Sequence, residues 1–279
     1  MGYSSLRSCI DDLEKNGHLI RISQEVDPNL EMASIHLKEF KNSGKAILFE
    51  NVKGSKYPAV SNIFGTIERS NFIFRKSIKK VKKLIDLKMN PINGFKDPIS
   101  SVKSAIYATM ALPKKVSFPK DFEEIKISEI PQIKCWPDDG GAFITLPQVY
   151  SEDILNPGIM NSNLGMYRIQ ISGNEFIKDK EIGLHYQIHR GVGIHQKHAI
   201  DNGENLKVSI FIGGPPSHTF AAVMPLPDGM SEITFAGILE GRRFRYALKD
   251  GYTISVDADF VICGEVSTEL KPEGPFGDH

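Results

Sequence analysis

Hydrophobic positions in the first third of the chain alternate between helical and strand-like spacing. Leu6, Ile10 and Leu13 recur at i, i+4 and i+7 behind two serines suited to cap a helix, and Asn16-Gly17 is a plausible stop. The pattern then predicts strands over 18–22, 46–49 and 59–64, with a helix over 29–41. Helices and strands in alternation predict an α/β unit over residues 1–112.

From residue 140 onward the pattern changes to short apolar or alternating runs. Turn residues such as Gly241 and Asp250-Gly251 separate these runs, as expected between antiparallel strands. Strands at this spacing are typical of a barrel or a sandwich. The runs cover 143–146, 167–172, 207–212, 219–223, 235–239, 244–248, 252–256 and 260–263.

Prolines recur between the two parts, and long periodic segments are scarce there. We therefore place a linker at 113–139, between a domain over 1–112 and a second domain over 140–279. A length of 279 residues fits one large or two modest domains.

Composition narrows the class of protein. The 34 Lys and Arg residues balance 34 Asp and Glu residues, so the chain offers a polyanion no overall attraction, and we expect no nucleic-acid partner. Three cysteines far apart predict neither a disulfide framework nor a Cys-x-x-Cys metal site. The start of the chain lacks the apolar stretch of a signal peptide, and no run approaches the roughly 20 apolar residues of a membrane span. We expect a cytoplasmic protein, with a membrane-peripheral position left open.

A basic segment over 69–88 carries eight Lys or Arg residues and one acid, Asp86. Ile78, Val81 and Ile85 form a helical apolar stripe through it. The segment is either a surface for an anionic partner or the solvated face of an amphipathic helix, and the second is the commoner case.

Polar residues suited to chemistry concentrate in the second half. Four histidines lie within fourteen positions, at 185, 189, 195 and 198, but the His-Glu-x-x-His pattern of a hydrolytic zinc site is absent. Arg168 supplies a planar fork able to hold a carboxylate or phosphate. Glu273 and Asp278 are two acids on one loop, and neighbouring acids can divide acid and base duties. Taken singly, each has an ordinary structural explanation.

Taken in order, these pieces resemble the UbiD family of decarboxylases, weakly through residues 1–112 and strongly from about 130 onward. The motifs that carry the resemblance are Ile130-Pro131, Asp138-Asp139-Gly140-Gly141 through Pro147, Asn163-x-Gly165-x-Tyr167-Arg168, His189-Arg190-Gly191, Met224-Pro225-x-Pro227 with Ser231-Glu232, and Glu273-Gly274-Pro275-Phe276-Gly277-Asp278-His279.

The resemblance implies an α+β protein in which an N-terminal α/β domain precedes a split β-barrel that binds prenylated FMN. The implied activity is reversible, non-oxidative decarboxylation of an aromatic or α,β-unsaturated carboxylic acid. A flavin prenyltransferase would supply the cofactor, which acts as an electron sink while the protein orients the substrate and supplies protons.

The resemblance also implies roles for individual residues. Arg168, Glu273 and Asp278 match the catalytic positions, with Arg168 expected to pair with Glu273. Asn163, Glu232 and His189 would hold Mn²⁺ or Mg²⁺, often with potassium nearby, and hard oxygen ligands suit such ions. The positions that match flavin contacts are Met166, Tyr167, Arg168, His185, Tyr186, Gln187, Arg190, Gly191, Met224 and Pro225.

Members of the family usually continue well beyond the acidic motif, into a C-terminal domain that helps close the site and build oligomers. The sequence is therefore compatible with a homo-oligomer or with a complementing C-terminal chain. Three hypotheses follow: a decarboxylase, a non-catalytic flavin- or metal-binding subunit of a larger enzyme, or an FMN-dependent reductase on a similar barrel. A reductase has no need for Glu273-x₄-Asp278, and the identity of the acid substrate is open.

Overall fold

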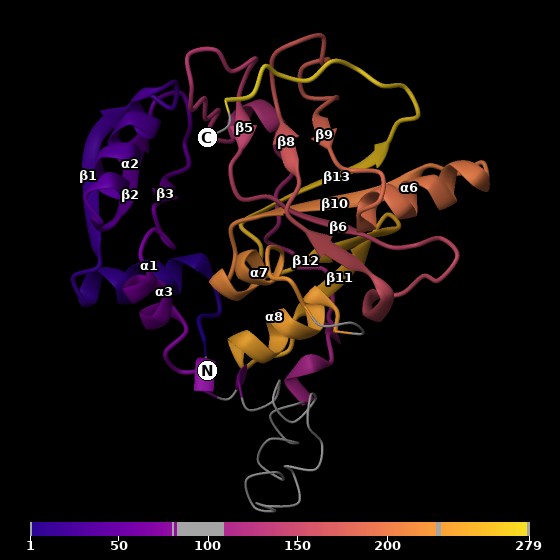
Figure 1. The fold of residues 1–279 in the computed structure, drawn as a ribbon, viewed down its shortest axis with the longest axis horizontal. Coiled ribbons are helices and arrows are strands. Elements are labelled where there is room, and N and C mark those ends of the chain that lie inside the picture. The colour runs from indigo at the N-terminus through magenta and orange to yellow at the C-terminus, as the bar shows by residue number, and fades with distance from the viewer. Residues whose placement is uncertain (1, 80, 83–108, 227–229, 278–279) are drawn as a thin grey trace, which may run out of the picture.

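A computed structural model describes residues 2–79, 81–82, 109–226 and 230–277 (Figure 1). The N-terminal elements lie together on one side of the molecule, and the later strands fill the other side. The first group comprises α1 (Leu6–Lys15), β1 (Leu19–Val26), α2 (Glu31–Lys41), β2 (Ala46–Val52), β3 (Ala59–Ser61) and α3 (Ile67–Ile73). The predicted α/β alternation is confirmed.

The N-terminal sheet has the order β1-β2-β3. Strands β1 and β2 run parallel, with Leu19 opposite Ala46, and α2 is the crossover between them. Strand β3 pairs antiparallel with β2. Ser5 caps α1 by accepting a hydrogen bond from the Ser8 backbone N–H, as the serine before the apolar stripe predicted.

The later strands form three small sheets. Their orders are β13-β10-β6-β7, β12-β11-β4 and β5-β8-β9. Within the described residues these sheets do not close into one barrel, so the fold is mixed α and β and the split-barrel form is not confirmed. The strands are β4 (Lys114–Lys115), β5 (Phe143–Ile144), β6 (Gln148–Ser151), β7 (Asn163–Gly165), β8 (Arg168–Gln170), β9 (Gly183–His185), β10 (Leu206–Ile212), β11 (Arg245–Lys249), β12 (Tyr252–Ser255) and β13 (Phe260–Val266).

Two predicted strands are wrong, because 219–223 and 235–239 lie largely in helices. The helices are α7 (Pro216–Ala221) and α8 (Glu232–Glu240). Pro216 opens α7, while Ser231 caps α8 and Gly241 ends it in the left-handed region at φ 70°. Nearly every residue of α8 is buried, so it lacks the polar face that separates a helix from a buried strand in sequence.

No helix in the described part of the chain is long and apolar enough to cross a membrane.

The largest apolar core joins both halves of the chain. Cys9 and Leu13 of α1 share it with Phe74, with Ile233 of α8 and with Phe244. The predicted linker also enters the fold, because β4 pairs with β11. The division at residues 112 and 139 remains a prediction.

The basic segment has a structural role at its beginning. Arg69 is only 3% exposed, and its guanidinium donates to the carbonyl oxygens of Gly44, Asn62 and Ile63. Arg69 thus ties the loop before α3 to the loop before β2 and is no part of a solvated face. Ile78 and Val81 pack on the large core, as the stripe predicted. The predicted positions 83–88 lie outside the described residues.

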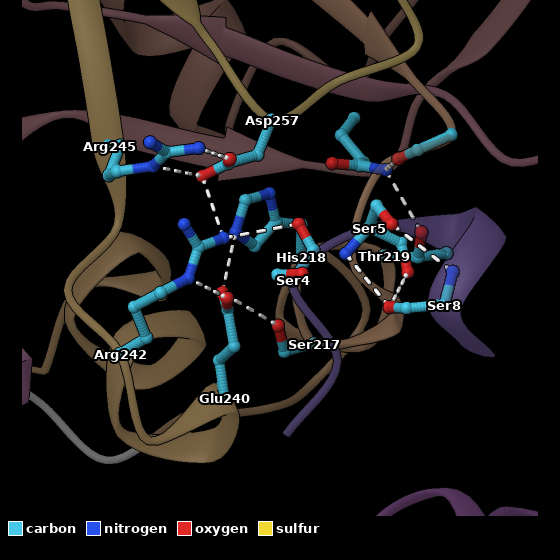
Figure 2. Close-up of polar contacts among 12 residues, drawn as sticks. Ser4, Ser5, Ser8, Ser217, His218, Thr219, Glu240, Arg242, Arg245 and Asp257 are labelled. Carbon is cyan, nitrogen blue, oxygen red and sulfur yellow. Dashed lines mark hydrogen bonds and ion pairs between the residues drawn. The ribbon is translucent and has the colours of Figure 1, made fainter. Parts of the chain in front are cut away.

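A buried cluster of charged side chains lies where α7 and α8 meet β11 and β12 (Figure 2). The Glu240 carboxylate accepts from Arg242 Nε at 2.5 Å, and His218 Nε2 lies 3.3 Å from it. Arg242 and Arg245 also pair with Asp257. The Glu240 carbonyl accepts the Gly2 backbone N–H at 2.5 Å, so the cluster also holds the start of the chain.

We predict that Glu240→Ala lowers the free energy of unfolding by about 3 kcal/mol, because Arg242 loses one of its two carboxylate partners and the buried His218 loses the carboxylate beside it. Urea unfolding followed by circular dichroism measures this. The control is Asp11→Ala, which breaks an exposed pair with Arg7 and costs less than about 1 kcal/mol. Equal effects of the two substitutions would contradict a structural role for the cluster.

Candidate active site

Arg168 of β8 and His185 of β9 stand directly opposite each other in the antiparallel register. Both reach the same carboxylate. Arg168 Nε donates to Glu273 Oε1, and His185 Nδ1 lies 2.7 Å from Glu273 Oε2. The predicted Arg168–Glu273 pair is therefore present, and His185 is a second partner of this glutamate.

The segment over 273–277 is held against β8 by several contacts. The Gly274 N–H donates to Gln170 Oε1 at 2.8 Å, and the Gly277 N–H donates to Asp139 Oδ1 at 2.7 Å. The Phe276 ring lies 4.4 Å from the Arg168 guanidinium carbon. These contacts position Glu273 and Arg168 together. The second predicted acid, Asp278, lies outside the described residues.

The Asp139-Gly140 turn supports this segment from the other side. A side chain at Gly140 would come within 2.0 Å of the Gly274 carbonyl oxygen, and the Gly140 N–H donates to the Pro275 carbonyl at 2.7 Å. Asp139 Oδ2 accepts backbone N–H groups from Cys135 and Trp136. The sequence pattern includes this turn among its motifs but indicates no role for it. Its paired glycines are a signal of close backbone approach.

A second polar group forms where β7 meets the start of α6 (Gly191–Asp201). The Tyr167 hydroxyl donates to Asn163 Oδ1 at 3.3 Å and accepts the Val192 N–H at 3.4 Å. A side chain at Gly191 would come within 2.1 Å of Asn163 Oδ1. Among the described residues, the buried Asn163 Nδ2 has no hydrogen-bond partner. An orphaned buried donor calls for an explanation, and here, beside the N-terminus of α6, a bound ligand would supply one.

Glu232 lies next to this group at the first position of α8. Its Oε2 accepts the N–H of Leu164, the residue after Asn163, at 3.4 Å. Burial raises the pKa of the Glu232 carboxyl above its ordinary value. His189 is exposed in the turn that leads into α6. Among the described residues, no three His, Cys, Asp or Glu side chains lie close enough together to hold a metal ion. The predicted metal ligands include only two residues of these types, Glu232 and His189.

The remaining predicted flavin-contact residues lie in the β7–β8 connection, in the turn before α6 and in the segment after α7. The Met166 N–H donates to the Ala222 carbonyl at 3.1 Å, which brings the β7–β8 connection against the segment that carries Met224 and Pro225. Tyr186 is half-buried, while Gln187 and Arg190 are exposed in the turn before α6. Contacts between described residues join Arg168, His185 and Glu273 in one group, and Asn163 and Tyr167 with Glu232 beside them in the other, whereas Arg190 contacts Gln187.

Two family models match the chain. The 3-octaprenyl-4-hydroxybenzoate carboxy-lyase Rift-related domain matches residues 110–279, and the corresponding N-terminal domain matches residues 10–88. The chain belongs to the UbiD family. A 4-hydroxybenzoate decarboxylase subunit from Chlamydia pneumoniae is 36% identical over 99% of this chain and 47% of its own length. An uncharacterised Chlamydia caviae protein is 36% identical over 100% of this chain and 48% of its own length.

Solved UbiD-class structures share the fold. A vanillic acid decarboxylase of Sedimentibacter hydroxybenzoicus, in closed form, aligns with TM-score 0.79 and 24% identity over 100% of this chain and 58% of its own. HmfF of Pelotomaculum thermopropionicum, in an evolved dimeric form in complex with prFMN, aligns with TM-score 0.77 and 21% identity. The alignment covers 99% of this chain and 60% of the HmfF chain. The chain spans about half the length of the curated relatives it matches.

The histidines of this UbiD-family chain do not converge on one site. His185 contacts Glu273, whereas His195 and His198 belong to α6 and contact Ser151 and Asp153 at 2.9 Å. The last two contacts tie α6 to the end of β6 and the loop after it. His189 does not share an element with His185, because β9 ends at His185 and His189 lies in the turn before α6.

We predict that His195 makes the protein less stable in acid. Burial lowers the pKa of its imidazole, so the unfolded chain binds a proton at a higher pH than the folded chain does. Stability is then lost as pH falls below the ordinary pKa of histidine, about 6.5, toward the lower folded value. Urea unfolding between pH 5 and 8 measures this. As the pH falls, the free energy of unfolding should decrease less for His195→Gln than for the wild type. An unchanged slope would contradict this assignment.

Proposed function

We propose that this chain is the cofactor-binding part of a prenylated-FMN-dependent decarboxylase that acts on an aromatic or α,β-unsaturated carboxylic acid. The Arg168–Glu273–His185 group carries the proposal, because it joins a cation suited to a carboxylate, on β8, to an acid on the loop over 273–277. The names of the relatives support the same class of reaction. A plain FMN reductase would not require such a group.

The second polar group fits the phosphate end of the cofactor. The orphaned Asn163 Nδ2 is a donor suited to a phosphate oxygen, and it lies at the N-terminus of α6, where backbone N–H groups favour anions. Tyr167, Gly191 and the turn over 187–190 would border it. Met166, Met224 and Pro225 are placed to border the ring system. When bound, prenylated FMN supplies the electron sink for loss of CO₂.

We further propose that Glu232, Asn163 and His189 hold Mn²⁺ or Mg²⁺ beside that phosphate, with potassium nearby. A cation there would compensate the buried Glu232 carboxylate, whose charged form is disfavoured by burial. When the ion is bound, the Asn163 amide would be rotated, so that its carbonyl oxygen, the hard ligand that such ions prefer, replaces the nitrogen as the group that faces the phosphate.

In the proposed reaction Arg168 orients the substrate carboxylate. Glu273 engages its Nε, and the Phe276 ring lies against the guanidinium, so the plane of the fork is restrained. The terminal nitrogens of Arg168 donate to no other group among the described residues, which leaves them for a carboxylate. Glu273 or Asp278 then delivers a proton to the carbon that CO₂ has left.

A second candidate function is that of a partial subunit without activity of its own. The observation that favours it is assembly in the relatives, since one is named as a subunit of 4-hydroxybenzoate decarboxylase and another is a two-chain vanillic acid decarboxylase. A complementing C-terminal chain, or a second copy of this chain, would complete the site. We place the enzyme in the cytoplasm, where a flavin prenyltransferase can load it.

We predict that the chain, co-expressed with a flavin prenyltransferase and Mn²⁺, binds prenylated FMN. Asn163→Ala should lower cofactor occupancy at least tenfold, whereas Glu273→Gln should leave it unchanged. Absorbance spectra and the mass of the released cofactor measure occupancy. A folded, colourless wild-type protein would overturn the proposed cofactor site.

We predict that Glu273→Gln lowers decarboxylation of a susceptible acid by about 100-fold or more, because general acid–base groups typically contribute that much. Release of CO₂ from a panel of aromatic and acrylic acids measures the rate. The matched control is Glu265→Gln, at an exposed position of β13, and this variant should retain the wild-type rate. Equal rates for both variants would exclude a catalytic role for Glu273. A wild-type chain that binds cofactor but releases no CO₂ would favour the partial-subunit function.

We predict that the flavin-loaded chain binds Mn²⁺ and that Glu232→Gln weakens this binding at least tenfold, as loss of a charged ligand should. Electron paramagnetic resonance of free Mn²⁺ during a titration measures the affinity. Asp201→Asn, at the exposed end of α6, serves as the control. The same affinity in the Glu232 variant and the control would overturn the metal set.

A further inference from the structure

A cavity of about 400 Å³ lies between the N-terminal elements and the edge of the strand-rich part. Leu6 and Ile10 of α1 and Ala59 of β3 line one side, and Ile144 and Ile212 line the other. Cavities of this size are typical of small-molecule sites. The cavity lies where two groups of elements meet, which is a common place for such sites.

The wall of the cavity is largely apolar and rich in aromatic rings. Tyr57, Phe64, Phe143 and Phe260 all line it, and the Tyr57 and Phe260 rings meet edge to face with centroids 4.8 Å apart. Aromatic rings prefer offset or edge-to-face contacts with other rings. The lining therefore suits a small aromatic molecule better than a charged or strongly polar one.

Besides Arg7, Thr145 and Thr219, one carboxyl group contributes a polar side chain to this wall. Asp259 Oδ2 accepts the Gly214 N–H at 2.7 Å, and a side chain at Gly213 would come within 2.1 Å of the same oxygen. Asp259 is exposed toward the cavity, and in the described part of the chain its Oδ1 makes no hydrogen bond. Surrounding protein nevertheless raises the pKa of this carboxyl. A hydroxyl group can donate to its ionised form or accept from its protonated form.

The cavity is separate from the candidate active site. Arg168, Glu273, Asn163 and Glu232 do not line it. Phe143 connects the two places, because its ring lines the cavity and also meets the Phe276 ring at a centroid distance of 4.9 Å.

We propose that this cavity is a second binding site, for a small neutral aromatic alcohol of the phenol type. The ring would lie among Tyr57, Phe143 and Phe260, and the hydroxyl would hydrogen-bond to Asp259 Oδ1. The inference does not rest on the proposed decarboxylase activity, since its residues are different.

The probe for the test is 4-fluorophenol, with binding to the 279-residue chain followed by ¹⁹F NMR. We expect saturable binding by the wild type, and 4-fluoroanisole should bind about tenfold more weakly because it lacks the hydroxyl hydrogen. Asp259→Ala should weaken 4-fluorophenol binding about tenfold, whereas the exposed control Asp201→Ala should not. Ala59→Phe should abolish binding by filling the cavity.

Leu146→Trp, at the half-exposed rim of the cavity, is a second filling variant in case Ala59→Phe does not fold. Arg168→Ala distinguishes the two sites and should leave 4-fluorophenol binding unchanged. Binding that is lost in Arg168→Ala but retained in the filling variants would place the phenol at the candidate active site and overturn the proposal. No saturable binding by the folded wild type would also overturn it.

Discussion

The apolar core shared by both halves of the chain is the constraint on which the rest of the structure depends. Residues from α1, such as Leu13, pack with Phe74 and with Ile233 of α8 in one cluster. Separating the halves would expose this surface to water, which is unfavourable in proportion to the apolar area. The shared core therefore fixes α8, and with it Glu232, beside the strand that carries Asn163.

The candidate active site follows from strand register. Because β8 and β9 pair antiparallel with Arg168 opposite His185, both side chains lie on the same face and meet the same carboxylate. A slip of one residue would turn them to opposite faces. Gly140 permits the close backbone approach that brings Glu273 to them.

Polar groups in this protein differ in how well their partners satisfy them. The buried carboxylates of Glu240 and Asp257 pair with arginines, so this cluster has a structural role and needs no ligand. Asn163 Nδ2 and Asp259 Oδ1, by contrast, lack protein partners among the described residues. A buried donor such as Asn163 Nδ2 costs stability unless something binds it, whereas the exposed Asp259 oxygen can accept a ligand without such a cost.

The sequence by itself determined α1, because one face of this helix meets solvent and the hydrophobic period reports that face. It also determined β2, whose short run of consecutive buried apolar residues is typical of a strand buried on both faces. The order of several motifs along the chain also identified the family, and the resemblance to that family implied the Arg168–Glu273 pair. Only the tertiary structure decided that 219–223 and 235–239 are largely helical, because segments buried on all sides show no period. The partners of His185, the orphaned Asn163 donor and the aromatic cavity likewise depend on contacts between residues far apart in the chain, which no local pattern records.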